Sequence, residues 1–195
     1  MVPGMGRPRG FDEEAVVDQA METFWTHGYA GTSPADLAAA TGVAKGSLYN
    51  AFTSKRELFD RALARYDEMA RQLAEDYLSR PGSTKECLAA SLRFLVDTDL
   101  AAPQRRGCLV VNTTVELAGH DPEMSRALRL NQDHIIAALA ARIDEGRRAG
   151  DVHADVSAQA YAEFLMNTMV GLRVMAKIYD GPTLHRIIDS ALATL

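Results

Sequence analysis

Cysteine is scarce in this chain of 195 residues, and the only two, Cys87 and Cys108, do not form a CxxC pair. This pattern indicates neither a disulfide framework nor a zinc site. No long uncharged apolar run is present that could span a bilayer, and the amino-terminal residues lack the apolar segment of a signal peptide. We therefore expect a protein without cofactor, metal or membrane attachment that stays in the cytoplasm.

Catalytic motifs are also missing. The sequence contains no HExxH, P-loop or GxSxG pattern. Positive charge is in short supply, since 21 Lys and Arg against 26 Asp and Glu give a net charge of −5, and there is no polybasic tail. An enzyme or transport protein is therefore an alternative class with no motif in its favour, and we expect that the chain is not an enzyme.

Helix-ending and helix-capping residues are plentiful. They separate stretches whose apolar residues recur three and four positions apart, which predicts an all-α fold of about nine helices. We place a domain boundary between residues 1–60 and residues 61–195. The expected helices span residues 12–28, 34–41, 44–52, 54–78, 83–100, 108–119, 122–149, 155–179 and 182–195.

Residues 32–58 carry the most specific local pattern. Ser33 can cap a helix that begins at Pro34, and Asp36 places negative charge in its first turn. Gly42 ends this helix, because glycine adopts a positive φ without steric cost. Two short helices joined by a glycine turn are typical of a helix-turn-helix, whose second helix enters the DNA major groove.

The second of these helices has one apolar face. Leu48 and Phe52 lie four residues apart and predict its buried side. Ser54 followed by Glu57 predicts a capping box at the start of the next helix. The polar residues left to face DNA are Lys45, Ser47, Tyr49 and Asn50.

Positive charge near this motif is local. Lys45, Lys55 and Arg56 fall within residues 43–56, a stretch that contains no acidic residue. So few cations in each subunit predict salt-sensitive DNA binding that needs two subunits.

Four segments in this order resemble the DNA-binding domain of TetR-family transcriptional regulators: GRPRGFD at 6–12, FWTHGYAGTS at 24–33, DLAAATGVAKGSLYNAF at 36–52 and SKRELF at 54–59. The resemblance implies a homodimeric repressor that leaves an inverted-repeat operator in double-stranded DNA when a small-molecule effector binds. Ala44 departs from the family pattern, in which a serine often caps the recognition helix.

The resemblance also implies a set of DNA contacts. Two arginines would form an arm in the minor groove, three residues would hold phosphates, and the polar residues of the recognition helix would approach base edges. The minor-groove arm would be Arg7 and Arg9. The phosphate contacts would be Thr32, Tyr49 and Lys55, with Ser33 beside them. The residues at base edges would be Lys45, Ser47 and Asn50.

In such regulators the carboxy-terminal domain holds the effector between helices. An apolar stripe at helical spacing belongs to the core more often than to a pocket, so core packing is the alternative for each candidate. Asn112, Glu116 and His120 share one helix face and would anchor a ligand, or else Glu116 would pair with a neighbouring arginine. The candidate effector contacts are Leu92, Leu95, Leu109, Asn112, Val115, Glu116, His134, Tyr161, Phe164, Leu165 and Met169.

Two apolar helices close the chain. Residues 155–179 are apolar on nearly every side, and the last helix has an apolar stripe that includes Leu184, Ile188 and Leu192. The resemblance implies that these two helices pack against the same pair of a second subunit as a four-helix bundle. The alternative is that they only close the core of one subunit.

Cys108 follows Arg105 and Arg106 at a predicted helix start, a setting that favours a reactive thiolate. Some family members that sense electrophiles are similar around this glycine–cysteine pair. Cys108 is therefore a candidate redox or electrophile sensor, and the alternative is a small buried hydrophobe. For the whole chain, an architectural DNA-binding protein without an effector is a further alternative.

Overall fold

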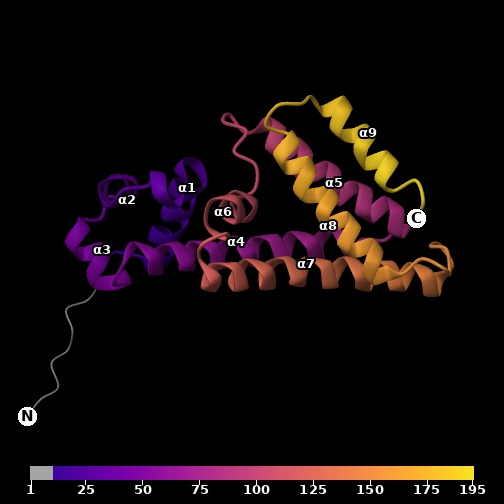
Figure 1. The fold of residues 1–195 in the computed structure, drawn as a ribbon, viewed down its shortest axis with the longest axis horizontal. Coiled ribbons are helices and arrows are strands. Elements are labelled where there is room, and N and C mark those ends of the chain that lie inside the picture. The colour runs from indigo at the N-terminus through magenta and orange to yellow at the C-terminus, as the bar shows by residue number, and fades with distance from the viewer. Residues whose placement is uncertain (1–10) are drawn as a thin grey trace, which may run out of the picture. The chain divides into compact units, whose positions relative to one another are not determined.

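The structure, a computed structural model, describes residues 11–195, and within this range it contains nine α-helices and no strand (Figure 1). The predicted all-α class is confirmed, and each expected helix is present within a few residues of its predicted bounds. The helices are α1 (Glu13–Gly31), α2 (Pro34–Thr41), α3 (Lys45–Phe52), α4 (Lys55–Leu78), α5 (Thr84–Ala101), α6 (Leu109–Leu117), α7 (Pro122–Ala149), α8 (Ala158–Met175) and α9 (Gly181–Ala191).

The first helix runs past its predicted end. Gly28 has φ of 74° and ψ of 171°, which kinks α1, and the helix then continues to Gly31. Glycine is suited to this position because other residues are strained at such a φ. The arginines of the predicted minor-groove arm, Arg7 and Arg9, lie outside the described residues.

The chain forms two compact units, one extending to Arg65 and the other running from Tyr66 to Leu195. The boundary falls inside α4, a continuous helix of 24 residues. The same helix therefore closes the first unit and opens the second.

Aromatic side chains form the core of the first unit. Phe24 of α1, Phe52 of α3 and Phe59 of α4 are completely buried. The rings of Phe24 and Phe59 meet edge to face with centroids 4.8 Å apart, a favourable aromatic geometry. Leu48 is buried as well, so the two residues that the sequence predicted as the inner side of α3 are both buried.

The start of α2 has the predicted cap. Asp36 N–H donates to Ser33 Oγ at 3.2 Å, and Ser33 N–H donates to Asp36 Oδ2 at 2.8 Å. These bonds from Ser33 hold the pKa of the Asp36 carboxyl below its ordinary value. The reciprocal pair fixes where α2 begins, and hence where the turn to α3 falls.

The start of α4 has only the first half of its predicted capping box. Glu57 N–H donates to Ser54 Oγ at 3.1 Å. The N–H of Ser54 is bonded to the Phe52 carbonyl oxygen. The Glu57 carboxylate therefore accepts a hydrogen bond from the Thr53 hydroxyl instead.

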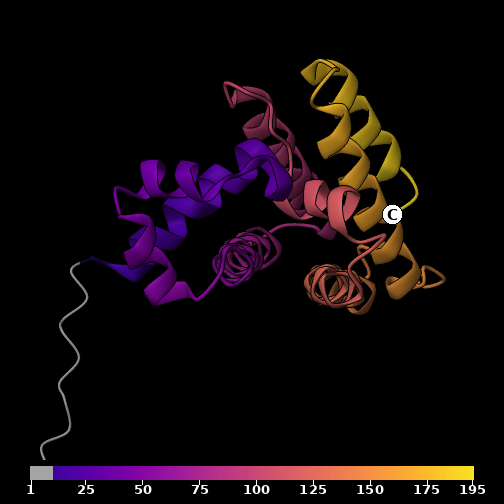
Figure 2. The ribbon, with the colours of Figure 1, turned by 60° about the vertical axis from the view of Figure 1, so that its left-hand side comes forward.

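In the second unit, α5, α8 and α9 lie side by side, and α7 packs against α8 (Figures 1 and 2). Leu88, Ile143, Leu165 and Leu184 come from these four helices and are completely buried. Among residues 11–195 the structure has no helix with the length and apolar character that crossing a membrane requires.

The apolar stripe of α9 is used inside its own subunit. Leu184, Ile188 and Leu192 are all buried, whereas Arg186 and Asp189 are exposed. The stripe therefore closes the core of one subunit, and the face that α9 can present to a second subunit is polar.

Candidate functional site

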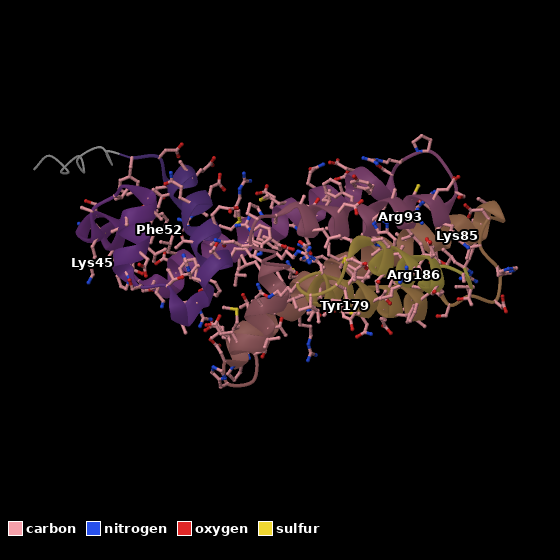
Figure 3. All side chains as sticks on the ribbon, turned by 90° about the horizontal axis from the view of Figure 1, so that it is seen from above. Lys45, Phe52, Lys85, Arg93, Tyr179 and Arg186 are labelled. Carbon is pink, nitrogen blue, oxygen red and sulfur yellow. The ribbon has the colours of Figure 1, made fainter. Side chains whose placement is uncertain are left out.

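The outer face of α3 carries the polar residues that the sequence predicted. Lys45, Ser47 and Asn50 are exposed, and Tyr49 is half-buried. Figure 3 shows the Lys45 side chain projecting outward, whereas Phe52 lies inside the first unit. A helix that is fixed on its inner side can present such a row to base edges and phosphates.

The start of α3 has no side-chain cap, as the departure at Ala44 predicted. Ala44 is the N-cap residue and makes no side-chain hydrogen bond there. The helix relies on backbone bonds instead, because Ser47 N–H and Leu48 N–H donate to the Ala44 carbonyl oxygen at 2.8 and 3.0 Å. Burial raises the pKa of the Tyr49 hydroxyl, which therefore stays protonated and can donate to a phosphate.

Two residues predicted at phosphates have a different place in the structure. Thr32 is completely buried, and its hydroxyl donates to the Gly28 carbonyl oxygen at 2.7 Å. Lys55 Nζ donates to the carbonyl oxygens of Tyr29 at 2.8 Å and Thr32 at 2.9 Å. It also lies 4.3 Å from the centroid of the Tyr29 ring. A cation at the carboxyl end of α1 stabilises the fold, so both side chains support the domain in this conformation rather than facing DNA.

The remaining cations near the motif differ in how accessible they are. Arg56 Nε donates to both carboxylate oxygens of Asp60, at 2.9 and 3.1 Å. Lys55 and Arg56 are half-buried, whereas Lys45 is exposed. Ser33 is exposed as well, although its hydroxyl caps α2. Among the basic residues of 43–56, Lys45 is therefore the best placed to contact DNA.

The second unit encloses a largely apolar cavity of about 80 Å³, whose wall comes from α4, α5, α6, α7 and α8 together with Cys108. For comparison, an apolar cavity of roughly 150 Å³ holds benzene, and sites for drug-sized ligands measure about 300–1,000 Å³. In this conformation the cavity has room for only a few heavy atoms.

Four predicted effector contacts line this cavity, namely Leu92, Leu95, Leu165 and Met169. The structure does not bring the other seven to it. Val115 is 84% exposed and Phe164 is 48% exposed, because both lie on outward faces of their helices. The seven are Leu109, Asn112, Val115, Glu116, His134, Tyr161 and Phe164.

Three of these seven are held by other partners. Asn112 donates to the Arg106 carbonyl oxygen at 2.9 Å and accepts from Lys177 Nζ at 3.0 Å. The Tyr161 hydroxyl donates to the Ala191 carbonyl oxygen at 2.5 Å. His134 Nδ1 lies 3.7 Å from an oxygen of Asp67 on the outer side of α7. The polar row expected on α6 therefore does not reach the cavity.

One end of the cavity is polar, and most of that end was not predicted. The Tyr66 hydroxyl lies 3.4 Å from Cys108 Sγ and accepts from Arg173 at 3.3 Å. Arg173 also donates to both carboxylate oxygens of Asp99, at 2.7 and 2.8 Å, and to the Gly107 carbonyl oxygen at 3.2 Å. This cluster joins α4, α5, α8 and the segment that precedes α6.

Charge in this cluster is balanced. Burial raises the pKa of the Tyr66 hydroxyl, and the neighbouring Cys108 acts in the same direction, so Tyr66 is a neutral phenol. Burial acts to lower the pKa of Arg173, but the nearby Tyr66, Cys108 and Asp99 outweigh it and the pKa is raised. Arg173 is thus a permanent cation that faces the Asp99 carboxylate.

Comparison with protein families decides how this architecture is classified. Residues 16–62 match the model of bacterial regulatory proteins of the tetR family, and residues 85–192 match that of the tetracyclin repressor-like C-terminal domain. The chain belongs to the TetR family.

TetR-family relatives match nearly the whole chain. An uncharacterised HTH-type transcriptional regulator, YezE of Bacillus subtilis, is 32% identical over 98% of this chain and 100% of that protein. The HTH-type transcriptional repressor ComR of Escherichia coli is 30% identical over 97% of this chain and 90% of that protein. A cysteine variant of the TetR family transcriptional regulator CifR, solved with a 26-base-pair operator DNA, is 33% identical over 96% of this chain and 98% of that chain, with a TM-score of 0.86.

Membership of the TetR family makes this chain a helix-turn-helix transcriptional regulator, as the sequence predicted. The helix-turn-helix consists of α2 and α3, with α3 as the recognition helix. The second unit is the helical domain that accompanies it.

Proposed function

We propose that this TetR-family protein is a homodimeric repressor that binds an inverted-repeat operator and leaves it when a small, neutral, largely apolar effector occupies the cavity of the second unit. The exposed polar face of α3 carries the DNA-binding part of this proposal. One subunit has one such face, and an inverted repeat presents half-sites about 34–36 Å apart, so two subunits are needed.

The lining of the cavity supports a neutral effector. Arg173 is its charged residue, and the guanidinium already makes two hydrogen bonds to Asp99. An anionic ligand would have to displace that buried carboxylate, and a cationic one would meet Arg173. Ser91 and Asn131 place neutral polar groups at the wall, where they can orient a carbonyl or hydroxyl group. The cavity binds the effector without converting it.

Helix α4 can couple effector binding in the cavity to DNA binding. Its first residues belong to the DNA-binding unit, and Tyr66 and Leu73, farther along the same helix, line the cavity. An effector that prefers a displaced α4 would shift the population toward a form with lower operator affinity. In this mechanism the effector does not need to contact the DNA.

The proposal is tested by selecting fragments of sheared genomic DNA with the purified protein at near-physiological salt and sequencing what is bound. Enrichment of a short inverted repeat is expected. Small neutral compounds are then screened for release of that DNA. Binding without sequence preference and without release by any compound would instead favour an architectural DNA-binding protein.

Replacing Lys45 with alanine should weaken operator binding by about 1–3 kcal/mol if the ammonium contacts a base edge. Fluorescence anisotropy with the selected operator measures this loss. Lys85→Ala is the matched control, because it removes another exposed lysine, from α5 in the second unit (Figure 3). Equal affinity of Lys45→Ala and the wild type would show that α3 does not use this residue.

A second candidate is a thiol-reactive effector that modifies Cys108. The observation in its favour is that Cys108 lies at the cavity wall, with its Sγ 3.4 Å from the Tyr66 hydroxyl. An electrophile small enough for the cavity would form a bond to this sulfur and displace the side chains around it.

Iodoacetamide tests this second candidate, since alkylation joins its methylene carbon to the sulfur and releases iodide. Cys108 should react faster than free cysteine, and the buried Cys87 should react more slowly. Alkylation should release wild-type protein from the operator but leave Cys108→Ser bound. Reaction at Cys108 no faster than for free cysteine would rule out the sensor.

A further inference from the structure

Two hollows meet at a thin wall between α4 and α7. One is the cavity of about 80 Å³, and the other is a groove of about 370 Å³ that is open to the surface. Ala74, Leu78 and Ile135 line both of them. At these three residues the cavity is therefore separated from the groove by the thickness of one side chain.

Hydrogen bonds close both ends of the α4–α7 seam, which we define as residues 67–78 with residues 131–142. At one end, Asn131 Nδ2 donates to Asp67 Oδ1 at 2.5 Å. At the other, Arg142 donates to the Gly82 carbonyl oxygen, just beyond α4, at 2.7 Å. Figures 1 and 2 agree that the second part of α4 runs alongside α7. The two ends hold the helices in register.

The outer part of the groove carries charged side chains, among them Arg71, Glu75 and His134. The three residues that line both hollows are apolar, and of these Leu78 and Ile135, each 8% exposed, are large enough to close the wall between them. Side chains change between staggered rotamers without moving the backbone. A rotamer change of Ile135 breaks no hydrogen bond, whereas the polar end of the cavity is closed by the bonds of Arg173.

We propose that small apolar molecules enter the cavity through the α4–α7 seam and that Ile135 is its gate. That the cavity is the effector site rests on the proposed function. The entry route itself rests only on the structure of the second unit. A gate at this place admits uncharged molecules most readily, because the three residues that separate the groove from the cavity are all apolar. It also explains how a cavity with so little internal space exchanges its contents with solvent.

The entry route can be measured with a thiol placed inside the cavity of the full-length protein. Leu165→Cys, in a Cys87→Ala and Cys108→Ser background, puts this thiol on α8 at a position that is completely buried. Methyl methanethiosulfonate, a small neutral reagent, transfers its methylthio group to the thiolate, which gives a methyl disulfide and releases methanesulfinate. The rate is followed by mass spectrometry. Adding Ile135→Ala should raise the rate by at least about tenfold, and Ile135→Val should give an intermediate rate.

Leu92→Ala is the matched control. It truncates a buried side chain that lines the cavity from α5 but does not line the groove. Its loss of packing is similar to that of Ile135→Ala, so labelling through general loosening or unfolding would raise both rates alike. The proposal predicts a rate for Leu92→Ala close to that of the parent.

Equal acceleration by Leu92→Ala, or no acceleration by either Ile135 variant, would overturn the gate. Urea unfolding of each variant shows that the proteins compared are folded. Because labelling involves neither DNA nor an effector, its result is independent of whether the protein is a ligand-released repressor. If no operator is selected but labelling is accelerated as expected, the proposed function would be wrong and the entry route would still be supported.

Discussion

Replacing Arg173 with methionine is expected to lower the free energy of unfolding by about 3–5 kcal/mol, the usual effect of leaving one buried charge without its partner. The side chains of Arg173 and Asp99 are only 11% and 4% exposed. The variant would leave the Asp99 carboxylate away from water without its guanidinium. It would also remove the bonds that Arg173 makes to Tyr66 and Gly107. Urea denaturation followed by circular dichroism measures the loss.

An exposed ion pair serves as control for Arg173→Met. Arg93 of α5, labelled in Figure 3, pairs with Asp189 of α9, and the two side chains are 42% and 59% exposed. Arg93→Met should change stability by no more than about 1 kcal/mol, because water and salt screen such a pair. Adding Asp99→Leu to Arg173→Met should restore part of the lost stability, since the unpaired carboxylate is then gone. Equal effects of Arg93→Met and Arg173→Met would show that the buried pair is not the source.

The Arg173–Asp99 pair illustrates what the sequence could not predict. Its two residues are 74 positions apart and come from different helices. A lone arginine in the apolar segment 155–179 signals a buried partner, but the sequence does not say which acid approaches it. The polar end of the cavity was missed for this reason, although Cys108 was recognised from its local setting.

Local signals, by contrast, predicted the helices well. The pair Ser33 and Asp36 forms a reciprocal cap within four residues, so the sequence contains the whole interaction. Thr32 and Lys55 show the limit of that reasoning. Lys55 reaches back 26 and 23 residues to the carbonyl oxygens that end α1, a tertiary contact that a pattern of helix starts does not reveal.

The effector contacts were predicted least well because a helix face cannot be assigned from one sequence. Leu92 and Leu165 turn into the cavity, whereas Val115 and Phe164 turn outward, and all four fit the same apolar periodicity. What separates them is which helices pack around each face. The same packing explains why the apolar stripe of α9 is buried, whereas some apolar residues of α8 remain exposed.

The outward face of α8 is the apolar surface that we expect a second subunit to cover. Phe164 and Val174 of α8 are 48% and 47% exposed, and Ile178, which follows the end of the helix, is 78% exposed. Gly171 lies between them with open space where a Cβ would be, which permits close approach of another helix. Burying these side chains is favourable, and a single twofold axis would bury them twice.

Replacing Val174 with aspartate is therefore expected to weaken dimerisation by at least about 100-fold, because two carboxylates would be buried near the axis without partners. Sedimentation velocity over a concentration series measures the shift to monomer, and operator binding should fall with it. Val115→Asp is the control, since Val115 is 84% exposed and belongs to a different helix, α6. A dimeric Val174→Asp together with a monomeric Val115→Asp would place the interface on α6 instead. If the α8 face is correct, loss of operator binding by Val174→Asp should be recovered at protein concentrations high enough to restore the dimer, because each α3 is intact and only its pairing is lost.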